Sequence, residues 1–379
     1  MKKKQIIILS VSVLILVVLS ICVYKFSGIF DKEVIADPIE VERDSLRIKM
    51  VGDDLIHNSI YFAAKTDTGY NFDMMFENVK QDIEEADIAI INQETILVSN
   101  PNRYSSYPTF GSPMQVGDAI VKAGFDVVAH ATNHTMDKGT SGIEDTLNFW
   151  RTNYPDISVL GIHENKEESD ICYLEKNNIK IAFINYTYGL NGIEIPKGKE
   201  YMVDVLGNDE KLIEILTEAK ENSDIVIPIL HIGTEYVYTP TNYHKKYVNL
   251  CIDNGATVVL CAHPHVLEPV EVVVTEEGNK GLVYYSLGNF ISNQKQIPTL
   301  LGGMADFIIE RNDEGNVEVK KYDLIPLVTH YTDNYYTTYK LSDYTNELAK
   351  EHKISRTSNF SVEKLWELYH KIVQTQEEV

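Results

Sequence analysis

The stretch VVLCAHPHVLEPVE, residues 258–271, places two histidines, His263 and His265, directly behind a run of apolar residues that favour a β-strand. Side chains at positions i and i+2 of a strand point the same way, so both imidazoles would face one centre if the strand geometry continued into the loop. Imidazole is a common ligand of metal ions in proteins. The stretch therefore predicts a pair of metal ligands at the end of a buried strand.

The same arrangement, an apolar run followed by polar groups, recurs along the chain. The other examples are LRIKMVGDDLIH (46–57), ADIAIINQET (86–95), FDVVAHATNHTMDKG (125–139), DIVIPILHIGTEY (224–236) and GLVYYSLGNF (281–290). Stretches with helical spacing, such as DEKLIEILTEAKEN (209–222), lie between them. Strands that alternate with helices predict an α/β layered fold, and apolar runs this continuous predict strands buried on both faces.

In folds of this kind, functional groups gather where strands end and loops begin. Each polar residue alone has a structural explanation, since Asp53 could cap a turn and His231 could be a core histidine. Six strand ends that all deliver carboxylate, amide or imidazole groups instead indicate a site for one or two divalent metal ions. Mixed imidazole and carboxylate ligands suit Mn, Fe or Zn, whereas Mg would prefer oxygen alone.

The N-terminal residues MKKKQIIILSVSVLILVVLSICVYKF carry a lysine cluster, followed by the uncharged segment from Ile6 to Tyr24. About 20 apolar residues span a bilayer, and positive charge on the short amino side keeps that side in the cytoplasm. A cleaved signal peptide or a lipoprotein modified at Cys22 are the alternatives. We expect a single-pass anchor in the cell membrane over 1–25, a linker over 26–45, an extracellular domain over 46–330 and a helical extension over 331–379.

The charge of the chain limits its partners. The 56 acidic and 34 basic residues give a formal net charge of −22, which repels phosphate backbones. We therefore expect no nucleic acid partner.

The segments VGDDLIH, NQET, ATNHTMDKG, LHIGTEY, AHPHVLEPVE and YSLGNF, in this order, resemble the bacterial capsule-synthesis family CapA, the poly-γ-glutamate capsule biosynthesis proteins. The resemblance covers about residues 46–295. That family in turn resembles the calcineurin-like metallophosphatases. The resemblance implies a metallophosphatase-like layered sandwich (α-β-β-α), placed here behind an N-terminal transmembrane helix, with a metal centre at the strand ends.

The resemblance also implies individual roles. The implied metal ligands are Asp53, Glu94, Asn133, His231, His263 and His265. The polar strand ends offer further candidates, which are His57, Asn92, Glu235 and Asn289. His134 would face the leaving oxygen of the substrate and, if Asp137 orients it, could protonate that oxygen. Leu55 stands where a metallophosphatase has a histidine ligand, and His57 is the nearest candidate to replace it.

Two functions are consistent with these residues. The first is a metal-dependent hydrolase or transferase that acts on a phosphoester or amide of a poly-γ-glutamate-like capsule or exopolymer. The second is a non-catalytic module that binds the polymer and assists its export or assembly. Both imply an anionic envelope polymer or its precursor, and other capsule-synthesis membrane proteins, as partners.

Overall fold

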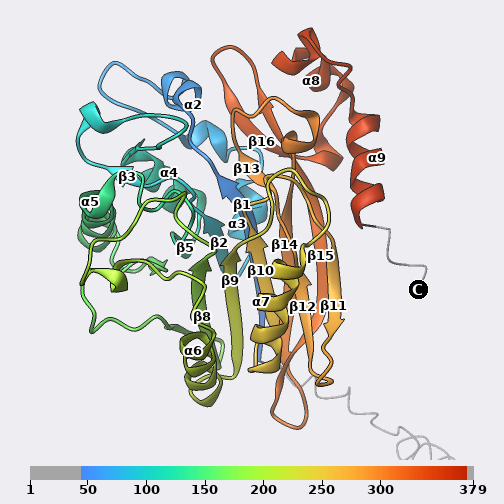
Figure 1. Cartoon of the computed structure of the whole chain (residues 1–379). Coiled ribbons are helices and arrows are strands. Elements are labelled where there is room, and N and C mark those ends of the chain that lie inside the picture. The colour runs from blue at the N-terminus through green and yellow to red at the C-terminus, as the bar shows by residue number, and fades with distance from the viewer. Residues whose placement is uncertain (1–43, 374–379) are drawn as a thin grey trace, which may run out of the picture. The chain divides into compact units, whose positions relative to one another are not determined.

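The computed structural model describes residues 44–373, which fold around two β-sheets (Figure 1). The larger sheet has the strand order β16-β15-β14-β1-β2-β5-β6, and β13 also pairs with β1. Its strands are β1 (Ser45–Asp54), β2 (Ile88–Asn92), β5 (Val127–Ala129), β6 (Ser158–Leu160), β13 (Asn289–Ile291), β14 (Leu301–Arg311), β15 (Val317–Tyr331) and β16 (Tyr336–Lys340).

The smaller sheet has the strand order β11-β12-β10-β9-β8-β7. Its strands are β7 (Cys172–Lys176), β8 (Ile179–Thr187), β9 (Ile225–His231), β10 (Val258–Ala262), β11 (Val270–Val274) and β12 (Lys280–Tyr284). A separate pair is formed by β3 (Leu97–Val98) and β4 (Ser112–Pro113). In each sheet four adjacent strands are parallel: β1, β2, β5 and β6 in the larger sheet, and β8, β9, β10 and β12 in the smaller sheet. Each sheet therefore has one edge at which the carboxyl ends of its parallel strands meet.

Side chains of the smaller sheet point alternately to its two faces, and each face packs against a different layer. In β9, Ile227 belongs to a core cluster that also holds Ile48 and Ile90 of the larger sheet, so the two sheets share one interior. Leu230 of the same strand belongs to a second cluster, with Leu216 from a covering helix. That face is covered by α6 (Asp209–Glu221) and α7 (Asn242–Asp253). The predicted α/β fold with layered sheets is confirmed.

Further helices pack around the larger sheet and its loops. Val116 and Ile120 on one face of α4 (Gln115–Ala123) join the core cluster of that sheet, as does Trp150 of α5 (Gly139–Asn153). The remaining α-helices of the described residues are α2 (Asn58–Ala63), α3 (Lys80–Glu84), α8 (Asn346–Glu351) and α9 (Val362–Val373).

The structure describes the C-terminal part of the chain as far as residue 373, whereas its description of the N-terminal part begins at residue 44. Beyond residue 330 the chain adds the edge strand β16 to the larger sheet before it forms α8 and α9, and Leu365 of α9 is fully buried. Among residues 44–373, no helix is both long and apolar enough to cross a membrane. The expected anchor over 1–25 and nearly all of the linker lie outside the described residues.

The loop between β12 and β13 runs unusually close to β1. The backbone amide of Asp53 donates to the carbonyl of Gly288 over 2.9 Å, and Asp53 pairs with Asn289 in the parallel ladder. A Cβ atom on Gly52 would lie 1.9 Å from the Gly288 carbonyl oxygen. Glycine at position 52 thus permits the close approach that brings Asp53 and Asn289 together.

We predict that Gly52→Ala lowers the free energy of unfolding by about 3 kcal/mol, because the added methyl group collides with backbone that cannot move aside. Chemical denaturation measures the effect. Gly189→Ala is the matched control, since within residues 44–373 no atom lies within 4 Å of its added Cβ. Equal stability of Gly52→Ala and the unmodified protein would contradict the proposed close packing.

Candidate metal centre

The carboxyl ends of the parallel strands of both sheets bring polar side chains to one place. Asp53 ends β1, Asn92 ends β2 and His231 ends β9. Glu94 follows β2 by two residues, and His263 directly follows β10. All five side chains are buried. The strand ends predicted from the sequence therefore converge on one buried polar cluster.

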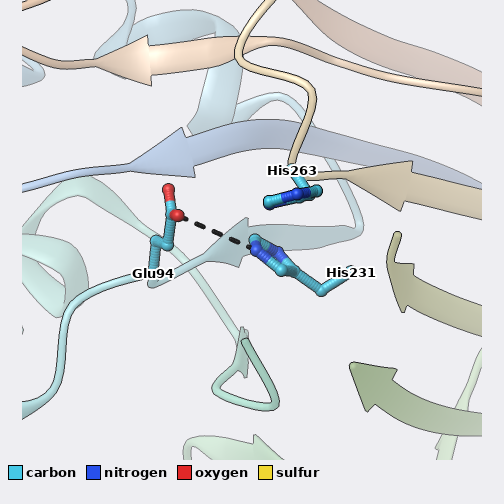
Figure 2. Close-up of side chains that lie close together, drawn as sticks. All are labelled: Glu94, His231 and His263. Atoms are coloured by element: carbon cyan, nitrogen blue, oxygen red, sulfur yellow. Dashed lines mark ion pairs between the residues drawn. The ribbon is translucent and has the colours of Figure 1, made fainter. Parts of the chain in front are cut away.

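The Glu94 carboxylate lies at the centre of this cluster. Its side chain is 1% exposed, and neither of its oxygens has a hydrogen-bond partner among the described residues. Burial raises the pKa of Glu94 well above its usual value. The nearest ring nitrogens, at 3.8–3.9 Å, belong to His231, His265 and His134. Figure 2 shows Glu94 and His231, joined by the dashed line, with the His263 ring beside them.

Asp53 is held by groups from both sheets. One of its oxygens accepts a hydrogen bond from Asn92 Nδ2 over 2.8 Å, and the other lies 3.1 Å from His265 Nδ1. The same nitrogen of His265 lies 3.0 Å from Asn289 Oδ1. These contacts fix the orientation of the His265 ring and leave Nε2 as its other nitrogen. A metal-binding histidine is commonly held in this way, by a carboxylate or carbonyl oxygen on the ring nitrogen that does not bind the metal.

His231 and His263 are neutral imidazoles in this environment. Burial, followed by the neighbouring histidines, lowers the pKa of both rings well below the usual value. His231 Nε2 lies 2.8 Å from Asn133 Oδ1. The ring centroids of His231 and His263 are 4.9 Å apart. His263 Nδ1 is buried and has no hydrogen-bond partner within residues 44–373. Neutral imidazoles can bind a cation without first losing a proton.

Potential ligand atoms within 4.8 Å of one another form three overlapping groups here. They are Glu94 with His231 and His263, Asp53 with Glu94 and His265, and Glu235 with His263 and His265. The unpartnered oxygens of Glu94 and the unpartnered nitrogen of His263 are donors that a cation would satisfy. The residues present therefore fit a divalent metal that accepts both imidazole and carboxylate.

His134 and Asp137 form a pair at the edge of the cluster. His134 Nδ1 lies 2.7 Å from Asp137 Oδ2, while His134 Nε2 faces Glu94 at 3.9 Å. The ring of Phe110 packs edge-on against His134. The carboxylate thus holds one ring nitrogen and directs the other toward the centre of the cluster.

The reason given above for the convergence of His263 and His265 is wrong, although the two rings do lie close together. The strand β10 ends at Ala262, and the φ angles of His263 and His265 are 110° and 59°. Strand alternation therefore does not continue into the loop. The ring centroids are nevertheless 5.8 Å apart, because the left-handed backbone turns both side chains toward the cluster.

His57 is not brought into the ligand groups found among the described residues. Its Nδ1 lies 3.0 Å from the Leu55 carbonyl oxygen and 3.2 Å from the Asn293 amide. Burial lowers the pKa of His57 to about 4. The His57 ring therefore supports the loop after β1. It does not replace the histidine ligand that a metallophosphatase has at the position of Leu55.

Two residues near the cluster were missed from the sequence. The Tyr188 ring lies 4.6 Å from that of His263, and Asn191 Oδ1 accepts a hydrogen bond from Asn133 Nδ2 over 3.3 Å. Both follow β8, whose sequence IKIAFINYT is another apolar run with a polar end. The rule applied to the other strands would have found them.

A second cluster of potential ligands lies elsewhere in the fold and is internally paired. His163 Nε2 is 2.9 Å from Asp204 Oδ2, and Lys211 Nζ is 2.7 Å from Asp170. Two of its residues, His163 and Asp170, line a cavity of about 520 Å³. Because its charges already neutralise one another, this cluster lacks the unpartnered atoms that distinguish the one around Glu94.

The comparison with protein families agrees with this arrangement of residues. The family described as bacterial capsule synthesis protein PGA_cap matches residues 47–294, which include every strand end of the cluster. This chain is a member of the PGA_cap family. The resemblance found in the sequence is thereby confirmed.

Two relatives that match this chain in sequence are named as bacterial capsule proteins. The PGA biosynthesis protein CapA of Bacillus subtilis (strain 168) is 31% identical over 200 residues, which are 53% of this chain and 51% of that protein. The capsule biosynthesis protein CapA of Bacillus anthracis is 25% identical over 296 residues, 76% of this chain and 69% of that protein. The match thus spans about half the length of the first relative.

Among solved structures, the NAD nucleotidase of Haemophilus influenzae aligns with a TM-score of 0.46 and 10% identity, over 86% of this chain and 60% of that one.

We predict that His263→Ala and His265→Ala remove most of the stabilisation by added Mn²⁺. Binding to the native state adds about 2.7 kcal/mol at a hundredfold excess over the dissociation constant, and each variant lacks one imidazole donor. Melting temperatures with and without Mn²⁺ measure this. His352→Ala is the control, because His352 is equally buried but lies against Tyr331. A Mn²⁺-dependent rise that persists in both variants would show that these histidines are not ligands.

Proposed function

We propose that this protein is a metal-dependent hydrolase or transferase that acts on a phosphoester or amide bond of a poly-γ-glutamate-like envelope polymer, on a metallophosphatase-like sandwich. The observation that carries the proposal is the buried Glu94 carboxylate, which has no hydrogen-bond partner among the described residues and whose nearest ring nitrogen belongs to the neutral imidazole of His231. Such a group is costly to bury unless a cation lies beside it. A bound divalent cation would supply the partner that both Glu94 oxygens lack among the described residues.

The metal would be one or two ions of Mn, Fe or Zn. Glu94, Asp53 and the histidines of the ligand groups would hold it, with Asn133 as an amide ligand beside His231. When bound, such an ion lowers the pKa of a water molecule toward neutrality and polarises the bond to be broken. Asn92 and Asn289 would keep Asp53 and His265 in position through the contacts described above.

His134 is the proposed proton donor to the leaving group. Asp137 accepts a hydrogen bond from Nδ1 of the ring, so the ring presents Nε2 toward the substrate side of the cluster. A histidine held in this way can give a proton to a leaving oxygen or nitrogen and take it back from water. His134 lies 3.9 Å from Glu94 but does not belong to the ligand groups found among the described residues.

The role in capsule formation follows from the family and from the names of its relatives. The two CapA proteins are described by their names as acting in biosynthesis of the capsule or of PGA. We extend this role to the present chain, with the segment from Ile6 to Tyr24 as its single membrane anchor and the domain after it outside the cell. An anionic polymer or its precursor is then the substrate, and other membrane proteins of capsule synthesis are its partners.

The activity is tested with the full-length protein in detergent. Hydrolysis of bis(p-nitrophenyl) phosphate should require Mn²⁺ and stop when a chelator is added. Polymer binding without turnover of this substrate or of poly-γ-glutamate would instead support a non-catalytic module for export or assembly.

We predict that His134→Ala lowers kcat for bis(p-nitrophenyl) phosphate by about 10²- to 10⁴-fold, the usual contribution of a positioned proton donor. Asp137→Asn should lower kcat less, because the imidazole remains but loses its carboxylate partner. Both variants should bind Mn²⁺ as the unmodified protein does. Loss of metal together with activity would instead place His134 among the ligands.

We predict that protease added to intact, wall-stripped cells digests the chain beyond residue 45. The physical reason is the lysine cluster before the apolar segment, which keeps the amino end inside. Immunoblots with antibodies to the C-terminal domain measure the loss of full-length protein. Complete protection, while a known extracellular protein is digested, would exclude this orientation.

A further inference from the structure

A third carboxylate lies next to the two histidines of the stretch 258–271. Ligand atoms of Glu235, His263 and His265 lie within 4.8 Å of one another, and Glu235 is exposed whereas both histidines are buried. His265 uses Nδ1 for Asp53 and Asn289, so Nε2 is free to face another group. His263 Nδ1 has no hydrogen-bond partner among the described residues. Glu235 is thus the one exposed member of the ligand groups found around Glu94 among the described residues.

The loop that carries Glu235 is fixed to the loop that carries the histidines. The Ile232 amide donates to the Ala262 carbonyl over 2.9 Å, and the Tyr236 amide donates to the Pro264 carbonyl over 2.8 Å. Gly233, with φ of 134°, packs so closely on Pro264 that a Cβ atom would lie 2.6 Å from its ring. Glu235 lies between these two hydrogen bonds. Its backbone is therefore held in register with His263 and His265 although its side chain faces solvent.

Tyr236 has a left-handed backbone conformation beside Glu235. Its φ angle is 65°, a left-handed value that is unfavourable for a bulky residue, and its side chain is 42% exposed. The phenol oxygen accepts a hydrogen bond from Gln294 Nε2 over 3.3 Å. The phenol also forms a side-chain hydrogen bond with the adjacent Glu235 carboxylate. Strain of this kind persists where a functional site needs it.

We propose that Glu235 is a metal ligand that completes a solvent-facing position with His263 and His265, and that Tyr236 is the positioning residue that holds its carboxylate there. The inference rests on the metal centre of the proposed function. Two imidazoles and one carboxylate leave coordination positions open for water and substrate, and Glu235 brings this group to the exposed side of the cluster. The group around Glu94, by contrast, consists of buried residues alone.

The test measures metal binding rather than activity. Metal-free, full-length protein in detergent is titrated with Mn²⁺, and free Mn²⁺ is followed by electron paramagnetic resonance. Glu235→Ala should weaken the most weakly bound Mn²⁺ at least tenfold. Glu235→Asp, which keeps the charge but shortens the side chain, should weaken it at least threefold. Glu276→Ala, at an exposed glutamate in the turn after β11, is the control and should bind Mn²⁺ normally.

Tyr236 is tested by two substitutions that separate positioning from folding. Tyr236→Phe removes only the hydroxyl group and should weaken the same Mn²⁺ about threefold. Tyr236→Gly should weaken it about tenfold, yet leave the melting temperature of the metal-free protein unchanged or raised, because glycine adopts a φ of 65° without strain. A purely structural role would lower the melting temperature and leave Mn²⁺ affinity unaltered.

The outcomes distinguish this inference from the proposed function. Normal Mn²⁺ affinity in Glu235→Ala or in Glu235→Asp overturns direct ligation by Glu235, whatever the activity of the protein. Normal affinity in both Tyr236 variants overturns the positioning role. Failure of the unmodified protein to bind Mn²⁺ overturns the inference together with the metal-dependent function. Mn²⁺ binding that depends on Glu235 without turnover of phosphodiester or polymer supports the inference and overturns only the proposed catalysis.

Discussion

The burial of the Glu94 carboxylate is the constraint on which the rest of the site depends. An ionised carboxylate removed from water without a partner costs several kcal/mol, so it must take up a proton or lie beside a cation. The nearest ring nitrogen to Glu94 belongs to the neutral imidazole of His231, whereas the Glu94 and Asp53 carboxylates raise the pKa of His265 to about 9. The described residues pair Glu94 with no lysine or arginine, and a bound cation would compensate the charge of this site. Burial of Glu94 would therefore lower the stability of the protein without a bound cation, and binding of a cation would raise it.

The two sheets explain how so many polar groups can be buried together. Parallel strands align their carboxyl ends, and the shared core holds the two sheets face to face. Loops from both sheets then meet over the same edge, and each loop has to turn sharply to reach it. Among residues 44–373 six non-glycine residues have positive φ, and four of them border the cluster: Asn191, Tyr236, His263 and His265. Backbone strain is concentrated where the ligand groups converge, and the rigid sheets beneath them support it.

The sequence was sufficient for six of the parallel strands (β1, β2, β5, β9, β10 and β12) and for the residues that their ends deliver, but β8 and its polar end were missed. Apolar runs that end in polar groups are a local signal, and the rule works because burial on both faces leaves no other place for those groups. The geometry beyond the last strand residue was not predictable in this way. His263 and His265 meet through left-handed turns rather than through strand alternation, and the ring of His57 turns to the Leu55 carbonyl oxygen and the Asn293 amide. Such details depend on contacts between loops far apart in sequence, such as the hydrogen bond from Tyr236 to Pro264.

The overall charge and the site impose opposite demands on an anionic ligand. A formal charge of −22 repels a polyanion, but at physiological salt this repulsion fades over about 8 Å. Under the proposed function, the polymer would therefore gain nothing from the general surface and would be attracted only where positive charge is localised. A divalent cation held by Asp53 and Glu94 would supply such a charge. The polymer would then be held where one of its oxygens can reach the metal, and the rest of it would be kept away from the acidic surface.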